Sequence, residues 1–325
     1  MVENGKIRIL AIAGPTASGK TALSIRLAQR LDGEIVSCDS MQVYRGMNVG
    51  TAKPTKEETC GVPHHLIDVA EPDTPFSVAE YVEAAKRAVE DICARGKLPI
   101  FCGGTGLYLD SFLRGGFEET SADPALRERL FAYAAQNGVH ALHERLRAVD
   151  PASADAIHEN NVKRVVRALE IYESTGVTKT DSDRRSQEGG YPYRATVIGL
   201  HYPDRALLYE RIALRVQIML EDGLLEEARA LDGQGVFLKN STAAQAIGYK
   251  ELLGYLHGEE PLEAAIERLI IATRRYAKRQ LTWFRAKDYV QWVDMATAGG
   301  VRPVDAVVDE VIELFHAVPK EGGTP

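Results

Sequence analysis

The sequence lacks the features that mark secreted scaffolds, membrane proteins and proteins that coat nucleic acids. Its 4 cysteines are scattered among 325 residues without C-x-x-C spacing, which argues against a disulfide framework and a cysteine zinc site. His64 and His65 are adjacent and lack the spacing of a metal pair. No apolar run approaches the length of a membrane span. The formal net charge is −7, so any contact with RNA must come from local basic patches.

The composition is that of a globular protein. Hydrophobic residues make up 45% of the chain and charged residues 26%, which suits one large or two modest domains with a real core. The residues before the first apolar run have no signal-peptide architecture. We therefore expect a cytoplasmic protein with reduced thiols and no membrane segment, and the sequence indicates no obligate protein partner.

The most informative segment, GPTASGKT at residues 14–21, fits the pattern G-x-x-x-x-G-K-[ST] and follows an apolar run over residues 7–13. Its two glycines permit a tight turn that aims backbone N–H groups at phosphate oxygens, and a helix expected at residues 22–31 adds the positive end of its dipole. The segment predicts a phosphate site, with Thr21 as the ligand of Mg²⁺. The expected phosphate ligands are Gly14, Thr16, Ala17, Ser18, Gly19, Lys20 and Thr21.

Two further short strands are expected at residues 34–38 and 98–102. In open parallel sheets, ligands bind beyond the carboxyl ends of the strands. The first strand delivers Asp39, Ser40, Met41 and Gln42 to that edge, and the second delivers residues 103–105, which end in Thr105. A phosphate cradle, a carboxylate and a hydroxyl then converge on one cleft, which is the pattern of an active site. The fold class that follows is α/β, with a P-loop NTPase-like core whose parallel sheet is flanked by helices.

An acidic residue at the end of a buried strand, which helps ATP-hydrolysing proteins to hold Mg²⁺, is missing. The best buried strand ends in Gly-Gly-Thr, and Asp68 after Leu66-Ile67 is only a weak candidate. The chain is therefore expected to hold a diphosphate without hydrolysing ATP.

The α/β pattern is interrupted in the middle of the chain. Helical segments with one polar side are expected at about 125–175, and a polar stretch over 179–190 precedes a strand at 195–200. This organisation predicts an inserted all-helical domain at residues 117–185 within a core made of residues 1–116 and 186–325. Long helices are then expected at 204–231 and 261–286, followed by a strand at 289–293 and a last helix at 303–317.

The helix expected at 261–286 carries a cationic stripe. At about 100° per residue, its basic side chains fall within an arc of about 140°, opposite the apolar ones. The stripe comprises Arg268, Arg274, Arg275, Lys278, Arg279 and Arg285. A charge run is usually a solvated helix face, but solvated faces mix signs and this one has almost no acid. We therefore interpret the stripe as a contact with RNA phosphates. Lys163, Arg164 and Arg167 form a second cluster at helical spacing in the insertion.

Seven blocks in order carry a resemblance to a known family over some 270 residues: GPTASGKT (14–21), DSMQVYRGMNVGTAKP (39–54), PHHLIDV (63–69), GGTGLYL (103–109), RALEIYESTG (167–176), QAIGYKE (245–251) and RRYAKRQLTWFR (274–285). Together they resemble the bacterial tRNA dimethylallyltransferases. The resemblance implies transfer of a dimethylallyl group from dimethylallyl diphosphate to N6 of the adenosine that follows the anticodon, position 37, in tRNAs reading codons that begin with U. It also implies that the insertion closes over the anticodon stem-loop.

The resemblance assigns roles to the candidate residues. Lys20 and a Mg²⁺ on Thr21 would neutralise the leaving diphosphate, Asp39 would accept the proton of N6, and Thr105 would bind the substrates. Ser40 and Gln42 would contact the flipped-out adenine. The expected contacts with tRNA are Asp39, Ser40, Met41, Gln42, Thr105, Arg127, Lys163, Arg164, Arg167, Gln245, Tyr249, Lys250, Arg274, Arg275, Lys278 and Arg279.

The chain departs from the family pattern at two places. His158-Glu159-Asn160-Asn161 stands where many members have His-Pro-Asn-Asp, and some members have arginine in place of Gln245. Three other functions fit parts of the pattern: a small-molecule P-loop kinase, an isopentenyltransferase acting on free nucleotides, and a non-catalytic nucleotide-binding scaffold. The first two have no use for the stripe, and the third has little use for Asp39 beside Thr105.

Overall fold

A computed structural model describes residues 2–3, 6–114, 123–188, 193–240 and 242–317. The chain divides into two compact units, one formed by Met1–Leu113 with Pro192–Pro325 and the other by Arg114–Tyr191. The first boundary expected for the insertion, between residues 116 and 117, lies outside the described residues. The second, between residues 185 and 186, falls inside a helix that continues to Glu188. No helix in the described ranges combines the length and the apolar character that a membrane span needs.

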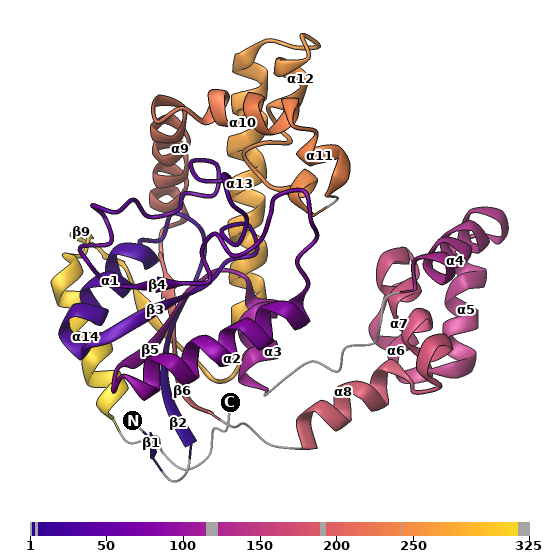
Figure 1. Ribbon diagram of the computed structural model, residues 1–325, viewed down its shortest axis with the longest axis horizontal. Coiled ribbons are helices and arrows are strands. Elements are labelled where there is room, and N and C mark those ends of the chain that lie inside the picture. The colour runs from indigo at the N-terminus through magenta and orange to yellow at the C-terminus, as the bar shows by residue number, and fades with distance from the viewer. Residues whose placement is uncertain (1, 4–5, 115–122, 189–192, 241, 318–325) are drawn as a thin grey trace. The chain divides into compact units, whose positions relative to one another are not determined.

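The first unit is built on a sheet with strand order β4-β3-β5-β2-β6-β7 (Figure 1). These strands are parallel throughout, and a short β1 adds antiparallel to β2. The strands are β1 (Val2–Glu3), β2 (Lys6–Ala13), β3 (Gly33–Cys38), β4 (His64–His65), β5 (Leu98–Gly103), β6 (Tyr193–His201) and β7 (Val290–Asp294). The predicted parallel sheet flanked by helices is confirmed.

Helices cover both faces of this sheet. α1 and α14 pack together on one face, and α2 and α3 pack on the other (Figure 1). The remaining helices follow β6, and a two-stranded ribbon precedes α14. The elements are α1 (Lys20–Leu31), α2 (Val78–Ala94), α3 (Gly106–Leu113), α9 (Arg205–Glu221), α10 (Leu224–Gly233), α11 (Val236–Lys239), η1 (Ala243–Gln245), α12 (Leu253–Leu256), α13 (Leu262–Arg285), β8 (Ala296–Thr297), β9 (Gly300–Val301) and α14 (Val304–His316).

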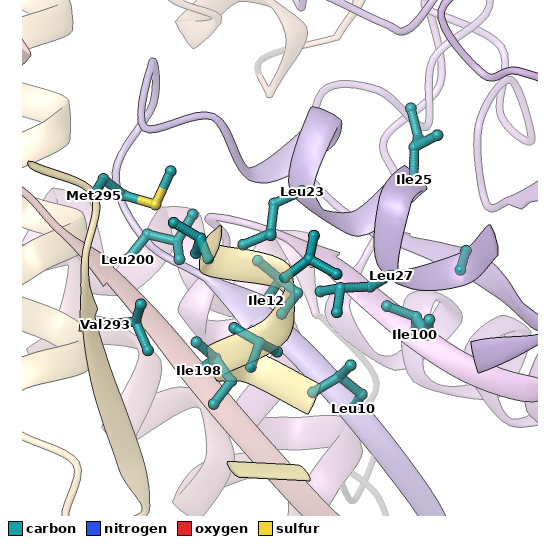
Figure 2. Close-up of a cluster of buried hydrophobic side chains, with 14 of the residues drawn as sticks. Leu10, Ile12, Leu23, Ile25, Leu27, Ile100, Ile198, Leu200, Val293 and Met295 are labelled. Atoms are coloured by element: carbon teal, nitrogen blue, oxygen red, sulfur yellow. The ribbon is translucent and has the colours of Figure 1, made fainter. Parts of the chain in front are cut away.

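Alternation along β2 explains the two layers, because successive side chains of a strand point to opposite faces. Leu10 and Ile12 point to the α1 face, where they pack with Leu23 and Leu27 (Figure 2). Each of these side chains is at most 1% exposed, and full burial of such a side chain stabilises a fold by about 1.5 to 3 kcal/mol. This packing holds the first turn of α1 at the carboxyl edge of the sheet.

The helix expected over residues 204–231 is two helices. α9 ends at Glu221 and α10 begins at Leu224, because Gly223 has φ 96° and its left-handed backbone cannot continue a helix. The prediction of one continuous helix was therefore wrong. The break turns α10 back so that its Glu227 reaches the loop after β3.

The second unit is helical in its described part. It contains α4 (Pro124–Asn137), α5 (Val139–Val149), α6 (Pro151–Ala156), α7 (Val162–Thr175) and α8 (Lys179–Glu188). Leu130, Leu142, Leu146 and Val165 lie in its apolar core. The stretch at 179–190 was expected only as a polar connection. The structure instead has α8 there, whose first turn is tied down because Asp150 accepts hydrogen bonds from the backbone N–H and the hydroxyl of Thr180.

Candidate active site

A cavity of about 340 Å³ opens at the carboxyl edge of the sheet in the first unit. Its walls come from the P-loop, the loop after β3, the end of β5, the helices α9 and α13, and the turn at residues 245–250. Four cations line it, and Asp39 is the one carboxylate among its lining residues. The cations are Lys20, Arg215, Lys250 and Arg279. The cavity is therefore suited to an anion of high charge.

The P-loop has the conformation that its sequence predicts. Gly14 and Gly19 have φ values of 142° and 92°, which other residues adopt only with strain. A Cβ added at Gly14 would lie 3.1 Å from the carbonyl oxygen of Leu200, so the loop also runs close to β6. Lys20 begins α1, and its Nζ donates to the carbonyl oxygen of Pro15 at 2.6 Å. The ammonium group is thereby held over the loop.

Two long side chains, one from α9 and one from α13, fix the P-loop in place. The Thr16 N–H donates to Oε1 of Gln280 at 2.8 Å, while Nε2 of Gln280 donates to the carbonyl oxygen of Gly104 at 3.1 Å. Nε of Arg211 donates to the carbonyl oxygen of Ala17 at 2.9 Å. A single buried glutamine therefore joins the loops that follow β2 and β5. Because the Thr16 N–H is used in this way, the expectation that it points at phosphate is wrong for this conformation.

The predicted phosphate ligands separate into two groups. Thr16, Lys20 and Thr21 line the cavity. Ser18 is fully buried, and its hydroxyl has no hydrogen-bond partner among the described residues. Gly14, Ala17, Ser18 and Gly19 therefore shape the turn, and their contact with a phosphate would be through the backbone.

Two half-buried cations, Lys20 and Arg215, line this part of the cavity. Burial lowers the pKa of Lys20 to about 8, against the opposing effect of Asp39. Burial also lowers the pKa of Arg215, again opposed by Asp39. A cation that is withdrawn from water in this way gains from an anionic ligand more than an exposed one does. The two groups form the strongest candidate clamp for a diphosphate.

The loop after β3 presents Asp39 to the cavity. Its Oδ1 accepts hydrogen bonds from the N–H groups of Met41 at 2.9 Å and Gln42 at 3.4 Å. The carboxylate thus closes a local turn, and the rest of it faces the cavity. Thr105 supports the same loop, since its Oγ1 accepts from the Ser40 N–H at 3.0 Å. Thr105 stands behind Ser40 and is absent from the cavity wall.

The side chain of Gln42 is engaged within the protein. Its Nε2 donates to the carbonyl oxygens of Thr51 and Ala52, both at 3.2 Å, and its Oε1 accepts from Ser37 at 2.9 Å. The expected hydrogen bond from this amide to an adenine would have to replace these contacts. In the observed conformation Gln42 positions the wall formed by residues 50–52.

Tyr249 was expected to contact tRNA, and the structure contradicts this. The side chain is fully buried, and its hydroxyl donates to Oε1 of Glu227 at 2.7 Å. The same carboxylate accepts from the N–H groups of Asn48, Val49 and Gly50, each at 2.9 Å. Tyr249 therefore helps to hold the loop after β3. Its neighbours Gln245 and Lys250 are exposed and line the cavity.

The stripe on α13 is only partly free. Arg275, Lys278 and Arg279 are exposed, and Arg279 also lines the cavity. Arg274 is half-buried, with its guanidinium 4.9 Å from the ring centre of Tyr209. Arg268 is paired with Glu260, which lies outside the helix. The expectation that the stripe has almost no acid beside it is therefore wrong at Arg268. Arg274 packs against Tyr209 of α9.

The insertion's basic residues also fall into two groups. Lys163 and Arg164 are exposed on α7. Arg127 and Arg167 both contact the buried carboxylate of Glu170, at 2.9 Å each. All four were expected to contact tRNA, with Lys163, Arg164 and Arg167 grouped by helical spacing. The structure instead gives Arg127 and Arg167 a role in holding α4 against α7.

The cavity could hold Mg²⁺ in one way. Within the described ranges, no group of three or more His, Cys, Asp or Glu side chains is arranged to hold a metal. Mg²⁺ often relies on a few protein oxygens together with substrate phosphates, and the Thr21 hydroxyl lines the phosphate end. Asp68, the weak alternative, forms an ion pair with Lys53 Nζ at 2.5 Å. Thr21 with a bound diphosphate therefore fits the ion better.

Arg215 is the site residue that sequence motifs missed. Leu208, Ile212 and Met219 are buried on one face of α9, and Arg215 takes the next position of the same 4-3-4 spacing. A charge at a position of an apolar stripe is unusual and commonly has a partner or a ligand. That signal was present in the sequence, but only the fold shows that this face of α9 meets the P-loop.

Comparisons with known proteins agree with this geometry. Residues 42–287 match the family described as IPP transferase. A tRNA dimethylallyltransferase of Bacillus velezensis is 49% identical over 318 residues, which cover 98% of each chain. Among solved structures, a tRNA isopentenylpyrophosphate transferase of Bacillus halodurans has a TM-score of 0.69 at 44% identity, with 95% of this chain and 97% of the other covered.

A eukaryotic dimethylallyltransferase, captured acting on tRNA, has a TM-score of 0.75 at 31% identity and covers 89% of this chain and 74% of its own. The matched segment contains the whole second unit, all of α13 and the loop after β3 from Gln42 onward. The similarity therefore extends well beyond the P-loop, which unrelated proteins share. On this basis the chain belongs to the IPP transferase family, and it is a transferase of the kind that modifies tRNA.

Proposed function

We propose that the protein transfers a dimethylallyl group from dimethylallyl diphosphate to N6 of adenosine 37, next to the anticodon, in tRNAs that read codons beginning with U. One observation carries the proposal: a cavity with two half-buried cations, Lys20 and Arg215, is also lined by a single carboxylate, Asp39. The cations suit a diphosphate and the carboxylate suits an amine that must lose a proton. Because tRNA is the acceptor, we place the enzyme in the cytoplasm.

The transfer exchanges one bond for another at the allylic carbon C1. The C1–O bond breaks, and its electron pair leaves with the diphosphate. The lone pair of N6 forms the new C1–N bond, and the proton released from N6 passes to the carboxylate of Asp39. Lys20 and Arg215 stabilise the charge that builds on the leaving oxygen. General-base help of this kind contributes about 10² to 10⁴ in rate.

Mg²⁺, when bound at Thr21, would add positive charge beside the leaving diphosphate. The protein's own residues provide the remaining groups. Gln280 keeps the loops after β2 and β5 together, so the anion site and the loop that Thr105 supports stay aligned. Glu227 holds the wall at residues 48–50. These contacts keep the acceptor and donor sites at a fixed separation.

The RNA contacts that we propose come from residues of both units. A base must leave its stack to reach the cavity, which costs a few kcal/mol and least in a loop. Ser40 and Met41 would touch the base or its neighbours, and the other residues would hold the RNA backbone. The proposed backbone contacts are Lys163, Arg164, Gln245, Lys250, Arg275, Lys278 and Arg279.

A transfer assay separates this function from the alternatives. The protein is incubated with labelled dimethylallyl diphosphate and either unmodified tRNA or AMP, and in parallel with ATP and a small kinase acceptor. We expect label in tRNA, at adenosine 37 by mass spectrometry of nuclease fragments, and no ATP consumption. Label in AMP alone would favour an enzyme of free nucleotides. Phosphate transfer from ATP would favour a kinase. Steady ATP consumption that depends on tRNA would contradict the proposal that the site binds a diphosphate donor and does not hydrolyse ATP.

A further inference from the structure

The cavity has an apolar end that the bond exchange itself does not use. Val216 and Met219 of α9 and Leu269 of α13 line this end, and all three belong to one buried cluster. Their side chains are at most 8% exposed. Such a surface inside a ligand cavity is suited to a hydrocarbon group.

The apolar end lies away from the phosphate end, as contacts along the two helices show. Arg211 marks the P-loop end of α9 and Gln280 marks that of α13. At 1.5 Å per residue, Met219 lies about 12 Å farther along α9 than Arg211. Leu269 lies about 16 Å from Gln280 along α13 by the same measure. Both side chains therefore line the cavity well away from the P-loop.

Arg215 and Met219 are one helical turn apart and share a face of α9. These four residues advance about 6 Å along the helix axis. With carbon–carbon bonds of about 1.5 Å, the three bonds of an extended dimethylallyl chain span roughly 4 Å. A geranyl chain has four more bonds and spans roughly 9 Å. The axial separation of Arg215 and Met219 is therefore comparable with the span of the shorter chain and less than that of the longer one.

The other substrate has a different wall. N6 of adenine must reach Asp39, which follows β3, and this side of the cavity also holds Ser40, Gln42 and the Gly103-Gly104 backbone. Ser40 offers polar contacts to a base edge, and Gln42 would do so by exchanging its hydrogen bonds with Ser37, Thr51 and Ala52. The end formed by α9 and α13 offers apolar ones, so it is left for the hydrocarbon of the donor.

We propose that Met219 limits the length of the allylic chain, so that the protein selects a five-carbon diphosphate donor over a ten-carbon one. The inference rests on the proposed function, because it assumes that the donor diphosphate sits at Lys20 and Arg215. Met219 is a better candidate than Leu269 for this limit, since it lies on the same helix face as the charge that positions the donor. Its unbranched thioether also fills irregular space at the end of a cavity.

The test compares dimethylallyl and geranyl diphosphate as donors for transfer to tRNA. The variants are Met219→Ala, the milder Met219→Val, and Ile218→Ala as the matched control, because Ile218 is 45% exposed on the same helix. The wild type is expected to use the dimethylallyl donor and to reject the geranyl donor. In Met219→Ala, the ratio of kcat/KM for geranyl over dimethylallyl should rise at least about tenfold, as misfits in apolar pockets are typically worth. Met219→Val should give a smaller rise and Ile218→Ala none.

Mass spectrometry of the modified nucleoside identifies the transferred chain, and circular dichroism checks that each variant is folded. If Met219→Ala does not fold, Met219→Val decides the matter. An unchanged donor ratio in a folded Met219 variant, or an equal rise in Ile218→Ala, would overturn the limit set by Met219. Absence of any transfer by the wild type from the dimethylallyl donor would instead contradict the proposed function, so the two failures are distinguishable.

Discussion

The two units differ in whether their partly buried cations have a carboxylate partner. In the core unit, Lys20 and Arg215 are half-buried at a cavity, and no described carboxylate forms an ion pair with either. In the insertion, Arg127 and Arg167 share the buried carboxylate of Glu170. A cation that is partly withdrawn from water and has no carboxylate partner is costly. Its presence in the core is explained by an anion that arrives with the substrate, whereas the insertion's pair is complete as it stands.

The largest expected effect concerns the single carboxylate among the core's cations. Replacing Asp39 with Ala should lower kcat for transfer to tRNA by about 10² or more, because the proton of N6 then has no acceptor. Binding of tRNA should stay near that of the wild type. The measurement is single-turnover transfer with saturating donor. Turnover within a few-fold of the wild type would mean that Asp39 serves only as the cap of the turn at residues 41–42.

The second prediction tests the unpaired cation directly. Arg215→Gln should raise KM for dimethylallyl diphosphate by about 10-fold to 100-fold, since hydrogen bonds to charged groups are typically worth about 1.5 to 3 kcal/mol. The matched control is Arg205→Gln, because Arg205 is an exposed arginine at the start of the same helix. Equal KM values for the two variants would remove Arg215 from the donor site.

Arg215 also shows where sequence reasoning stops. The P-loop was predictable because its turn depends on local backbone demands at Gly14 and Gly19. The sheet edge that gathers the loop of Asp39 was predictable from strand order. Gln280 binds the P-loop, and Arg215 lines the same cavity as Lys20, from helices far along the chain. Their roles therefore depend on packing that no local pattern encodes. The roles given to the individual site residues stay predictions.

Charge patterns had a similar limit. The sequence shows that Arg127, Arg167 and Arg268 are basic residues of predicted helices, but it does not show that Glu170 and Glu260 pair with them. Tyr249 was misjudged for the same reason, because its partner Glu227 lies on a helix that begins only after the break at Gly223. A residue becomes a contact or a support according to which partner the fold places beside it.

A third prediction uses the pH dependence of the unpaired ammonium. Burial lowers the pKa of Lys20 to about 8 in the free protein, and an anion favours its protonated form. Affinity for an unreactive analogue such as dimethylallyl thiodiphosphate should therefore be constant below pH 8 and fall by up to about tenfold per unit above it. Calorimetric titration measures this. Lys20→Arg is the control, because a guanidinium keeps its charge and its profile should stay flat. A wild-type profile that is flat from pH 7 to 9 would contradict the prediction.

The fourth prediction tests the paired arginines of the insertion. Glu170→Gln leaves two guanidinium groups facing an amide at a buried position, and this should lower the free energy of unfolding by about 1 to 3 kcal/mol. The control is Glu144→Gln, whose ion pair with Arg147 is exposed and is worth about 0 to 1 kcal/mol. Thermal denaturation compares the two. KM for the donor should not change in either variant. Equal stability of both variants would show that the Glu170 cluster is not what holds α4 and α7 together.

The smallest effect is expected on α13, where both kinds of cation occur on one helix. Arg275 and Arg279 are exposed, whereas Arg268 is paired with Glu260. If the first two contact RNA phosphates, each contact releases counterions, and the slope of log K against log salt should shrink by about 0.7 per contact removed from a loop region. Replacing both by Gln should weaken tRNA binding and leave donor affinity unchanged, while Arg268→Gln should leave the slope as it is. The slope is read from filter binding over a range of salt, with unaltered circular dichroism as a condition. A double variant with the wild-type slope would mean that this part of the stripe is a solvated helix face. The RNA backbone would then be held mainly by the insertion, at Lys163 and Arg164.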